Sequence, residues 1–210
     1  MLYFNTLPKI LTPDQNGNAI LLTNILTRAK LLEELQNNPM LFYTYDIQDG
    51  DTPEIIADKY YDDVNRFWII MYANQLLDPV WDWPLPQQQF LDFIDTKYKA
   101  VAEDAGETPF QYTNTEIYNY EKTIETLDSE TQLTNTTTVS IDETSYNALT
   151  PSSTTYTLPN GFTCTVTISK SAITIFQHEY TLNEAKRNIK ILNSSYASQM
   201  EDAFKKVMSK

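Results

Sequence analysis

The sequence predicts an α+β protein in which a β-rich segment lies between mainly helical segments. Apolar side chains recur at helical spacing in the first half of the chain, as at Phe67 and Ile70. Residues 112–176 are instead rich in Thr, Ser, Tyr, Asn and β-branched side chains. Within them, apolar residues alternate with threonines over residues 162–168, which is the period of a strand with two different faces.

The composition indicates a folded, soluble protein. Its 210 residues are 41% hydrophobic and 12% aromatic, too apolar for an intrinsically disordered chain. The formal net charge of -13 argues against nucleic acid and anionic membranes as partners, because both are bound through concentrated Lys and Arg. The longest apolar run is far shorter than the roughly 20 residues of a membrane helix, and the N-terminus carries no secretion signal pattern. A single cysteine, Cys164, excludes an internal disulfide and a paired-cysteine zinc or redox site.

The N-terminal region predicts an arm and then a helix. Two prolines and the turn pair Asn16-Gly17 favour an extended arm with a turn over residues 1–18. Apolar positions among good helix formers predict a helix over about residues 23–36, which Asn37-Asn38-Pro39 ends.

Residues 42–86 carry dense local signals. Phe42–Ile47 has the composition of a strand. Thr52 is a good N-cap and Pro53 suits the first position of a helix, because its missing N–H costs nothing there. A second helix follows over residues 67–74. Two tryptophans and two prolines within residues 80–86 then predict an ordered aromatic loop.

The rest of the chain changes character twice. A helix is expected from about Pro86 to Ala102, ending near Gly106. A strand at residues 156–158 then turns at Asn160-Gly161 into the alternating strand. Residues 128–153 leave two alternatives open, a mobile loop or a sheet edge that is covered only in an assembly.

The last 30 residues predict two helices. Asn183 can cap the first, with Ile189 and Leu192 on its apolar face, and Ser194 or Ser195 can cap the second. From residue 184 onward this tail carries six basic residues against three acidic ones.

The centre of the chain resembles a LysM domain over about 35 residues. The resemblance is carried by the strand at Tyr45, the turn Gly50-Asp51-Thr52 into a helix, and a second helix ending at Asn74. It implies a βααβ module. The Gly-containing approach to the last strand that is usual in this family is replaced by Trp81–Pro86.

The LysM resemblance allows two alternatives, because LysM modules usually bind glycans that contain N-acetylglucosamine. One is a peptidoglycan-binding module whose shallow groove would lie near Gly50, Asp51, Thr52 and Gln75. The other, which we favour, is a LysM-shaped packing unit without a sugar site, since one fold hosts unrelated functions.

With its flanks, the chain resembles the LysM-containing baseplate wedge subunit of T-even-like contractile-tailed bacteriophages. The start Met1–Asn5, the segment Phe67–Asn74 running into Asp78-Pro79, and the ending Glu179–Leu192 carry this resemblance. It implies a structural protein of the virion tail baseplate, assembled in the host cytoplasm, that joins wedges around the hub. Its implied partners are other baseplate wedge proteins and neighbouring wedges.

The candidate interface residues are Trp81, Trp83, Lys186 and Arg187, since aromatic and basic side chains commonly anchor protein interfaces. A lytic enzyme is the third alternative. His178 is the only histidine, so a histidine-based metal cluster is impossible, and four glycines supply no phosphate-binding loop. We therefore expect no catalytic, cofactor or metal site.

These observations together predict five segments along the chain. They are an N-terminal arm and helix (1–41), a LysM-like domain (42–86), a helix and linker (87–111), a β-rich segment (112–177) and a C-terminal helical segment (178–210).

Overall fold

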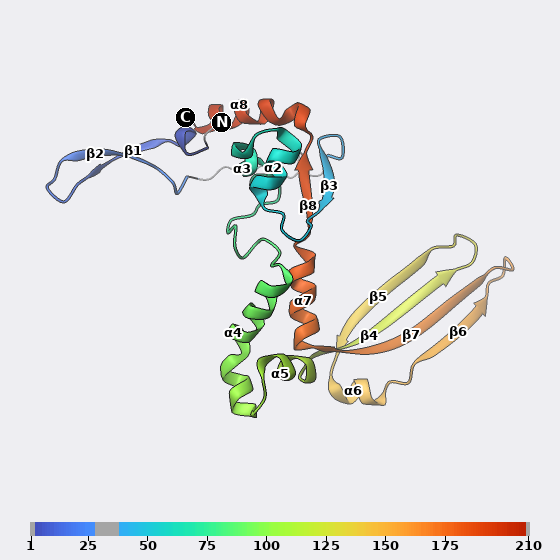
Figure 1. Cartoon of the computed structure of the whole chain (residues 1–210). Coiled ribbons are helices and arrows are strands. Elements are labelled where there is room, and N and C mark those ends of the chain that lie inside the picture. The colour runs from blue at the N-terminus through green and yellow to red at the C-terminus, as the bar shows by residue number, and fades with distance from the viewer. Residues whose placement is uncertain (1–2, 28–37, 209–210) are drawn as a thin grey trace. The chain divides into compact units, whose positions relative to one another are not determined.

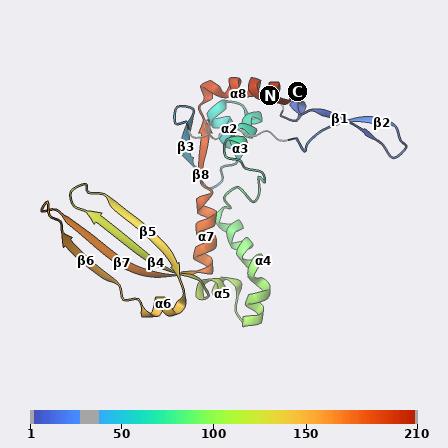
Figure 2. The same cartoon turned by 180° about the vertical axis from the view of Figure 1, so that it is seen from behind.

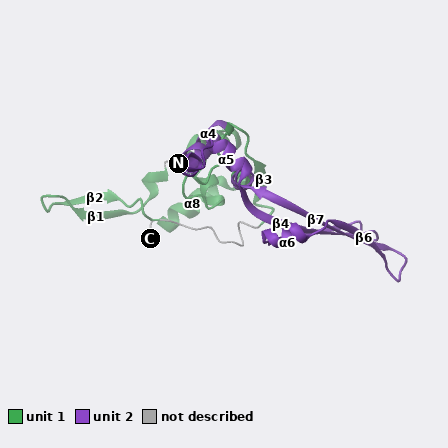
Figure 3. Ribbon diagram, turned by 90° about the horizontal axis from the view of Figure 1, so that it is seen from below, with its two compact units in different colours: residues 1–87, 183–210 green, residues 88–182 purple. Residues whose placement is uncertain are grey.

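The computed structural model describes residues 3–27 and 38–208. The chain divides into two compact units: unit 1 comprises residues 1–87 and 183–210, and unit 2 comprises residues 88–182 (Figure 3). Helices and antiparallel strands are both abundant, so the predicted α+β class is confirmed.

The centre of unit 1 is a βααβ module. It consists of β3 (Phe42–Asp46), α2 (Pro53–Tyr61), α3 (Phe67–Ala73) and β8 (Asn188–Leu192), with the short 3-10 helix η2 (Val64–Arg66) between the two α-helices. β3 pairs antiparallel with β8 (Figure 1). The predicted strand and both predicted helices are confirmed, but the strand that closes the module comes from near the C-terminus.

Local chemistry explains where α2 begins and ends. The Thr52 hydroxyl accepts a hydrogen bond from the backbone N–H of Ile55 at 3.3 Å, and Pro53 occupies the first turn. Asp62 ends the helix in the left-handed conformation, with φ of 52°. The predicted cap is therefore confirmed.

The core of unit 1 is an aromatic and aliphatic cluster between the helices and β8. Phe204 of α8 (Ala197–Met208) lies with its ring 4.8 Å from that of Trp68. Tyr3 of η1 (Tyr3–Thr6) stacks on Phe204 at 5.4 Å, so both ends of the chain pack on the same module. Other fully buried members of the cluster are Ile56, Ala57, Ile69, Ile70 and Ile191.

The prediction of the first C-terminal helix, which begins at Asn183 and includes Ile189 and Leu192, is wrong after Ala185. α7 (Ile175–Ala185) ends before Ile189 and Leu192, which lie in β8 instead. Their spacing fits a helix, but β3 needs a strand partner for its backbone groups and β8 supplies it. The second predicted helix is confirmed as α8. The 3-10 turn η3 (Ser194–Tyr196) precedes it and is capped by the side chain of Asn193, not by a serine.

Unit 1 also contains a two-stranded hairpin of β1 (Lys9–Pro13) and β2 (Ala19–Thr23). Gly17 takes a φ of 81° in its turn, and the Asp14 carboxylate accepts the backbone N–H of Asn18 at 2.7 Å. The predicted turn is confirmed. Of the helix predicted over residues 23–36, Thr23 lies in β2 and residues 24–27 form no helix, while residues 28–37 lie outside the described residues.

Three helices make up one part of unit 2: α4 (Gln87–Ala105), α5 (Pro109–Thr115) and most of α7. The Phe176 ring of α7 lies 5.6 Å from Phe90 and 5.5 Å from Phe110, so one aromatic side chain contacts both other helices. The predicted helix ending near Gly106 is confirmed as α4.

The other part of unit 2 is a four-stranded antiparallel sheet in the order β5-β4-β7-β6 (Figure 2). Its strands are β4 (Ile117–Asp128), β5 (Thr134–Ile141), β6 (Ser152–Thr157) and β7 (Thr163–Thr174), and α6 (Glu143–Ala148) connects β5 to β6.

The bounds of the sheet differ from those of the predicted β-rich segment (112–177). The sheet starts later and ends earlier than expected, because α5 and α7 occupy the flanks. The region left open at residues 128–153 contains the edge strand β5 and the helix α6. No residue of the four strands is buried.

Candidate functional site

The loop that follows α3 is tied to β8 by one side chain. The Asn74 side-chain amide donates to the backbone carbonyls of Ile70 at 2.9 Å and Lys190 at 2.8 Å. Its oxygen accepts the backbone N–H of Lys190 at 2.7 Å. One amide thus caps α3 and pairs with the backbone of β8 as a neighbouring strand would.

Two aspartates order the aromatic loop. The Asp82 carboxylate accepts the backbone N–H groups of Leu77 at 2.8 Å and Asp78 at 2.9 Å. Asp78 in turn accepts the N–H groups of Val80 and Trp81. The hydrogen bonds from Asp78 and Leu77 hold the pKa of Asp82 below its ordinary value, and the charge of Lys186 adds to this. The predicted ordered loop is confirmed.

The two predicted interface tryptophans have different environments. Trp83 is only 8% exposed, and its indole N–H donates to the backbone carbonyl of Asp51 at 2.9 Å. Trp81 is 57% exposed, and its backbone carbonyl accepts a hydrogen bond from the Lys186 ammonium at 2.6 Å. Trp83 therefore anchors the loop internally, whereas more than half of the Trp81 surface is exposed.

The two predicted basic interface residues lie at the approach to β8. The Arg187 guanidinium donates to the Glu184 carboxylate at 2.8 Å, to the Ile47 carbonyl at 3.0 Å and to the Asp49 carboxylate at 2.7 Å. All these partners belong to unit 1. Arg187 thus clamps the turn after β3 to the start of β8.

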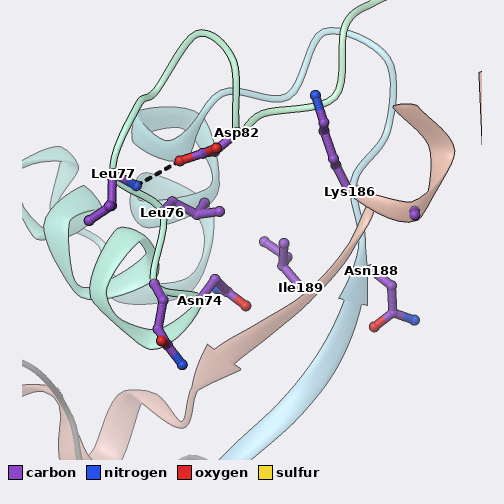
Figure 4. Close-up of a pocket in the computed structure, with 9 residues that line it drawn as sticks. Asn74, Leu76, Leu77, Asp82, Lys186, Asn188 and Ile189 are labelled. Carbon is purple, nitrogen blue, oxygen red and sulfur yellow. Dashed lines mark hydrogen bonds between the residues drawn. The ribbon is translucent and has the colours of Figure 1, made fainter. Parts of the chain in front are cut away.

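A pocket of about 490 Å³ lies between the loop after α3 and the approach to β8 (Figure 4). Asp82 and Lys186 supply opposite charges on its two sides, and Leu76 and Ile189 supply apolar surface. The remaining lining residues are Asn74, Gln75, Leu77, Ala185 and Asn188. Lys186, predicted as an interface residue, and Gln75, predicted as a glycan-groove residue, both line this pocket.

The structure gives the predicted glycan residues local structural roles. Gly50 takes a φ of 93° in the turn, and Thr52 caps α2. The Asp51 carboxylate accepts the Tyr45 hydroxyl at 2.6 Å and the Gln48 N–H at 3.0 Å. None of these three lines the pocket that Gln75 lines.

Other chemistry is limited within the described residues. No group of three or more His, Cys, Asp or Glu side chains in residues 3–27 and 38–208 is placed to hold a metal ion. None of the helices in those ranges is long and apolar enough to cross a membrane. His178 stacks on the Tyr118 ring with centroids 3.6 Å apart in unit 2.

Exposed apolar side chains that lie next to one another, as on β1 and β2, mark a surface suited to binding a partner. The sequence matches the family described as Base plate wedge protein 53 over residues 3–207, and the chain belongs to this family. The match spans both units. The chain matches no curated protein.

Membership in this family establishes the coarse role. The chain is a structural protein of a bacteriophage baseplate, its place is the tail baseplate of the virion, and it associates with other baseplate proteins.

Sequence reasoning missed two features of this site. The Asn74 amide joins α3 to a strand that lies 116 positions further along the chain, and no local pattern marks that pairing. The hairpin β1–β2 is more than the predicted arm with one turn. Its signal is the apolar run Ile20–Leu22, which fits the approach to a helix equally well.

Proposed function

We propose that this chain joins neighbouring wedges of a contractile, T-even-like tail baseplate as they assemble in the host cytoplasm, and that it is not an enzyme. The observation that carries the proposal is the apolar hairpin β1–β2. On one face Leu11 pairs with Leu21, and these side chains are 73% and 59% exposed. On the other face Ile10 pairs with Leu22, and both are exposed.

A hairpin of this kind supports a joining role for a physical reason. An isolated two-stranded hairpin is marginally stable in water, and this one exposes apolar side chains on both faces. A partner surface removes that apolar area from water. The proposed partner is another baseplate wedge protein, including one in the neighbouring wedge.

The βααβ module is, in this proposal, a LysM-like packing unit that begins in the predicted domain over residues 42–86 and is closed by β8. The groove side of such a module carries the turn at Gly50–Thr52. That turn is occupied by internal contacts, since Trp83 donates to Asp51 and Arg187 donates to Asp49. These contacts support a structural role for the module and not the binding of peptidoglycan.

Of the four predicted interface residues, Trp81 and Lys186 support direct contact with a partner. Trp81 presents an exposed ring, and Lys186 lines the pocket beside it. Trp83 and Arg187 act from within, because they hold the loop and the turn in place.

The double variant Leu11→Ser and Leu21→Ser tests the joining role of the hairpin. We expect tagged wild-type protein to co-purify wedge proteins from a phage-infected lysate, and the double variant to lose them. The matched control is Thr12→Ser on the other face of β1, which leaves both leucines in place.

Two outcomes would contradict the proposal. Equal recovery of wedge proteins by the double variant removes the hairpin from the interface. Sedimentation of the purified protein with peptidoglycan would show that the chain binds glycans. Lysis of purified cell walls would show that it is an enzyme.

A further inference from the structure

The sheet of unit 2 has two faces of different chemistry. Cross-strand partners share a face, so the pairs Ile124↔Ile168 and Thr126↔Val166 lie on one side and Thr123↔Thr138 and Glu125↔Thr167 on the other. We call the first side the apolar face. Its other apolar members are Tyr120 of β4, Val139 and Ile141 of β5, Tyr156 of β6, and Cys164 and Ala172 of β7.

The opposite side is a hydroxyl face. Its side chains hydrogen-bond one another across the strands: Thr123 to Thr138 at 3.2 Å, Ser153 to Thr167 at 3.0 Å and Thr155 to Thr165 at 3.0 Å. Such hydroxyl pairs are stable next to water. The hydroxyl face is therefore suited to solvent, and the apolar face is the side of the sheet that favours burial.

Little of unit 2 covers the apolar face. Val139 is 50% exposed and Tyr156 is 56% exposed. α6 covers only one end, where the Tyr146 ring lies 4.7 Å from that of Tyr120 and the Tyr146 carbonyl accepts the Lys170 ammonium at 2.7 Å. Figures 1 and 2 show no helix across the remaining length of the sheet in unit 2.

Charge is distributed unevenly along the apolar face. Lys122 and Lys170 lie directly opposite each other near the end covered by α6, and two like charges so placed repel. Asp128 lies on the same face at the far end of β4. Within the described residues, neither lysine has a carboxylate within 4.0 Å.

We propose that the apolar face binds the apolar face of a second copy of this chain, with the strands of the two sheets antiparallel. A two-fold axis perpendicular to the strands places β4 over β4, so that Lys122 of each copy meets Asp128 of the other. An axis parallel to the strands would place lysines against lysines. The charge pattern therefore selects a second copy in one orientation.

The size of the face sets the strength of the pairing. Four strands about 4.8 Å apart and about eight residues long cover roughly 500 Å² per copy, so the pair buries about 1,000 Å². This area is at the low end for specific interfaces, so we expect a weak dimer. The pairing does not rest on the proposed baseplate role.

Sedimentation equilibrium of the full chain tests the pairing over about 1 μM to about 1 mM protein. All proteins carry Leu11→Ser and Leu21→Ser, so that the hairpin does not contribute to association. We expect dimerisation of this background, and dimers at least about tenfold weaker for Lys122→Glu alone and for Asp128→Lys alone. The matched control Glu125→Lys changes a charge on the hydroxyl face and should leave the dimer intact.

An equimolar mixture of the two single variants tests directly whether residues 122 and 128 face each other across the dimer. The carboxylate introduced by Lys122→Glu in one variant then faces the ammonium introduced by Asp128→Lys in the other. The unchanged Asp128 of the first variant faces the unchanged Lys122 of the second, so the mixture should regain dimers. Restored dimers support the proposal. A background protein that stays monomeric, reversals without effect, or a mixture that stays monomeric would each overturn it.

Discussion

At the scale of single residues, Asn74 connects two elements of unit 1 through one polar side chain. Its amide forms one hydrogen bond to α3 and two to β8, and β8 is the strand that closes the module. Removing it deletes these three hydrogen bonds, and losing hydrogen bonds of partly buried groups is costly.

Asn74→Ala should lower the free energy of unfolding of unit 1 by about 2 kcal/mol. All three tryptophans, Trp68, Trp81 and Trp83, belong to unit 1, so their fluorescence during urea unfolding reports on this unit alone. Asn188→Ala, an exposed amide in β8, is the control and should change the value by less than about 0.5 kcal/mol. Equal effects of the two variants would rule out the bridging role.

Glu179 is the corresponding residue of unit 2. Its carboxylate is buried and accepts hydrogen bonds from the Lys97 ammonium and the Tyr98 hydroxyl, each at 2.7 Å. Burial alone raises its pKa, but these two hydrogen bonds outweigh it and hold the pKa below the ordinary value of 4.5. A lowered pKa in the folded state means that the group stabilises unit 2 above pH 4.5 and that this stability is lost as the pH falls through the folded pKa.

Hydrogen exchange of peptides from α4 and α7 measures this effect. Protection should fall as the pH drops below 4.5, and Glu179→Gln should remove about 1–3 kcal/mol of protection at neutral pH and flatten the acid dependence. Glu103→Gln changes an exposed carboxyl of α4 and serves as the control. An unchanged acid dependence in Glu179→Gln would assign the acid sensitivity to other groups.

Residue roles were predictable where they are local. Thr52 and Pro53 predict the start of α2 from adjacent residues alone, and the structure confirms the cap and the first-turn proline. Trp83 and Arg187 were predicted as interface residues, and that prediction stays untested. Trp83 donates to a carbonyl 32 positions away, and Arg187 donates to one 140 positions away. Only the folded chain shows that these contacts are internal.

At the scale of elements, α8 packs on unit 1 through a set of buried side chains in which Phe204 is the aromatic one. The buried Phe204 ring lies 4.8 Å from Trp68, 5.4 Å from Tyr3 and 5.6 Å from Tyr72. Helix α8 and the N-terminal turn η1 therefore depend on the same ring for their packing.

Phe204→Ala should cost about 3–5 kcal/mol of unfolding free energy, because it opens a cavity in an aromatic cluster. Tryptophan fluorescence should shift to the red as Trp68 gains contact with water. Val207→Ala on the exposed side of α8 should cost less than about 0.5 kcal/mol. A similar small loss for both variants would show that α8 does not stabilise the module.

Element types were predictable where one period dominates. The alternation over residues 162–168 predicted a strand, and it lies in β7 apart from its first residue. Ile189 and Leu192 are three positions apart, a spacing that fits a helix, and their strand state depends on β3. The hairpin strand β2 was missed for a related reason, since Ile20–Leu22 has no alternation to separate strand from helix.

At the scale of the whole molecule, both units carry apolar surface that their own residues leave exposed. The hairpin β1–β2 does so in unit 1 and the apolar face of the sheet does so in unit 2. Membership in the baseplate wedge family gives such surfaces a natural context, because the chain associates with other baseplate proteins. The sequence predicted this family through its resemblance. It also predicted an arm over residues 1–18 and left open a covered sheet edge within residues 128–153, but it did not identify the apolar residues of either surface.

Baseplate assembly from purified parts tests the central claim, that this chain joins wedges, most directly. Wedges are isolated from cells infected with phage that lack this protein, and complete baseplates are counted by negative-stain electron microscopy after purified chain is added. We predict that wild-type chain restores baseplates and that Leu11→Ser with Leu21→Ser restores at least about tenfold fewer, because two leucines lose their burial. Complete baseplates in the absence of the chain, or a wild-type yield with the double variant, would contradict the account.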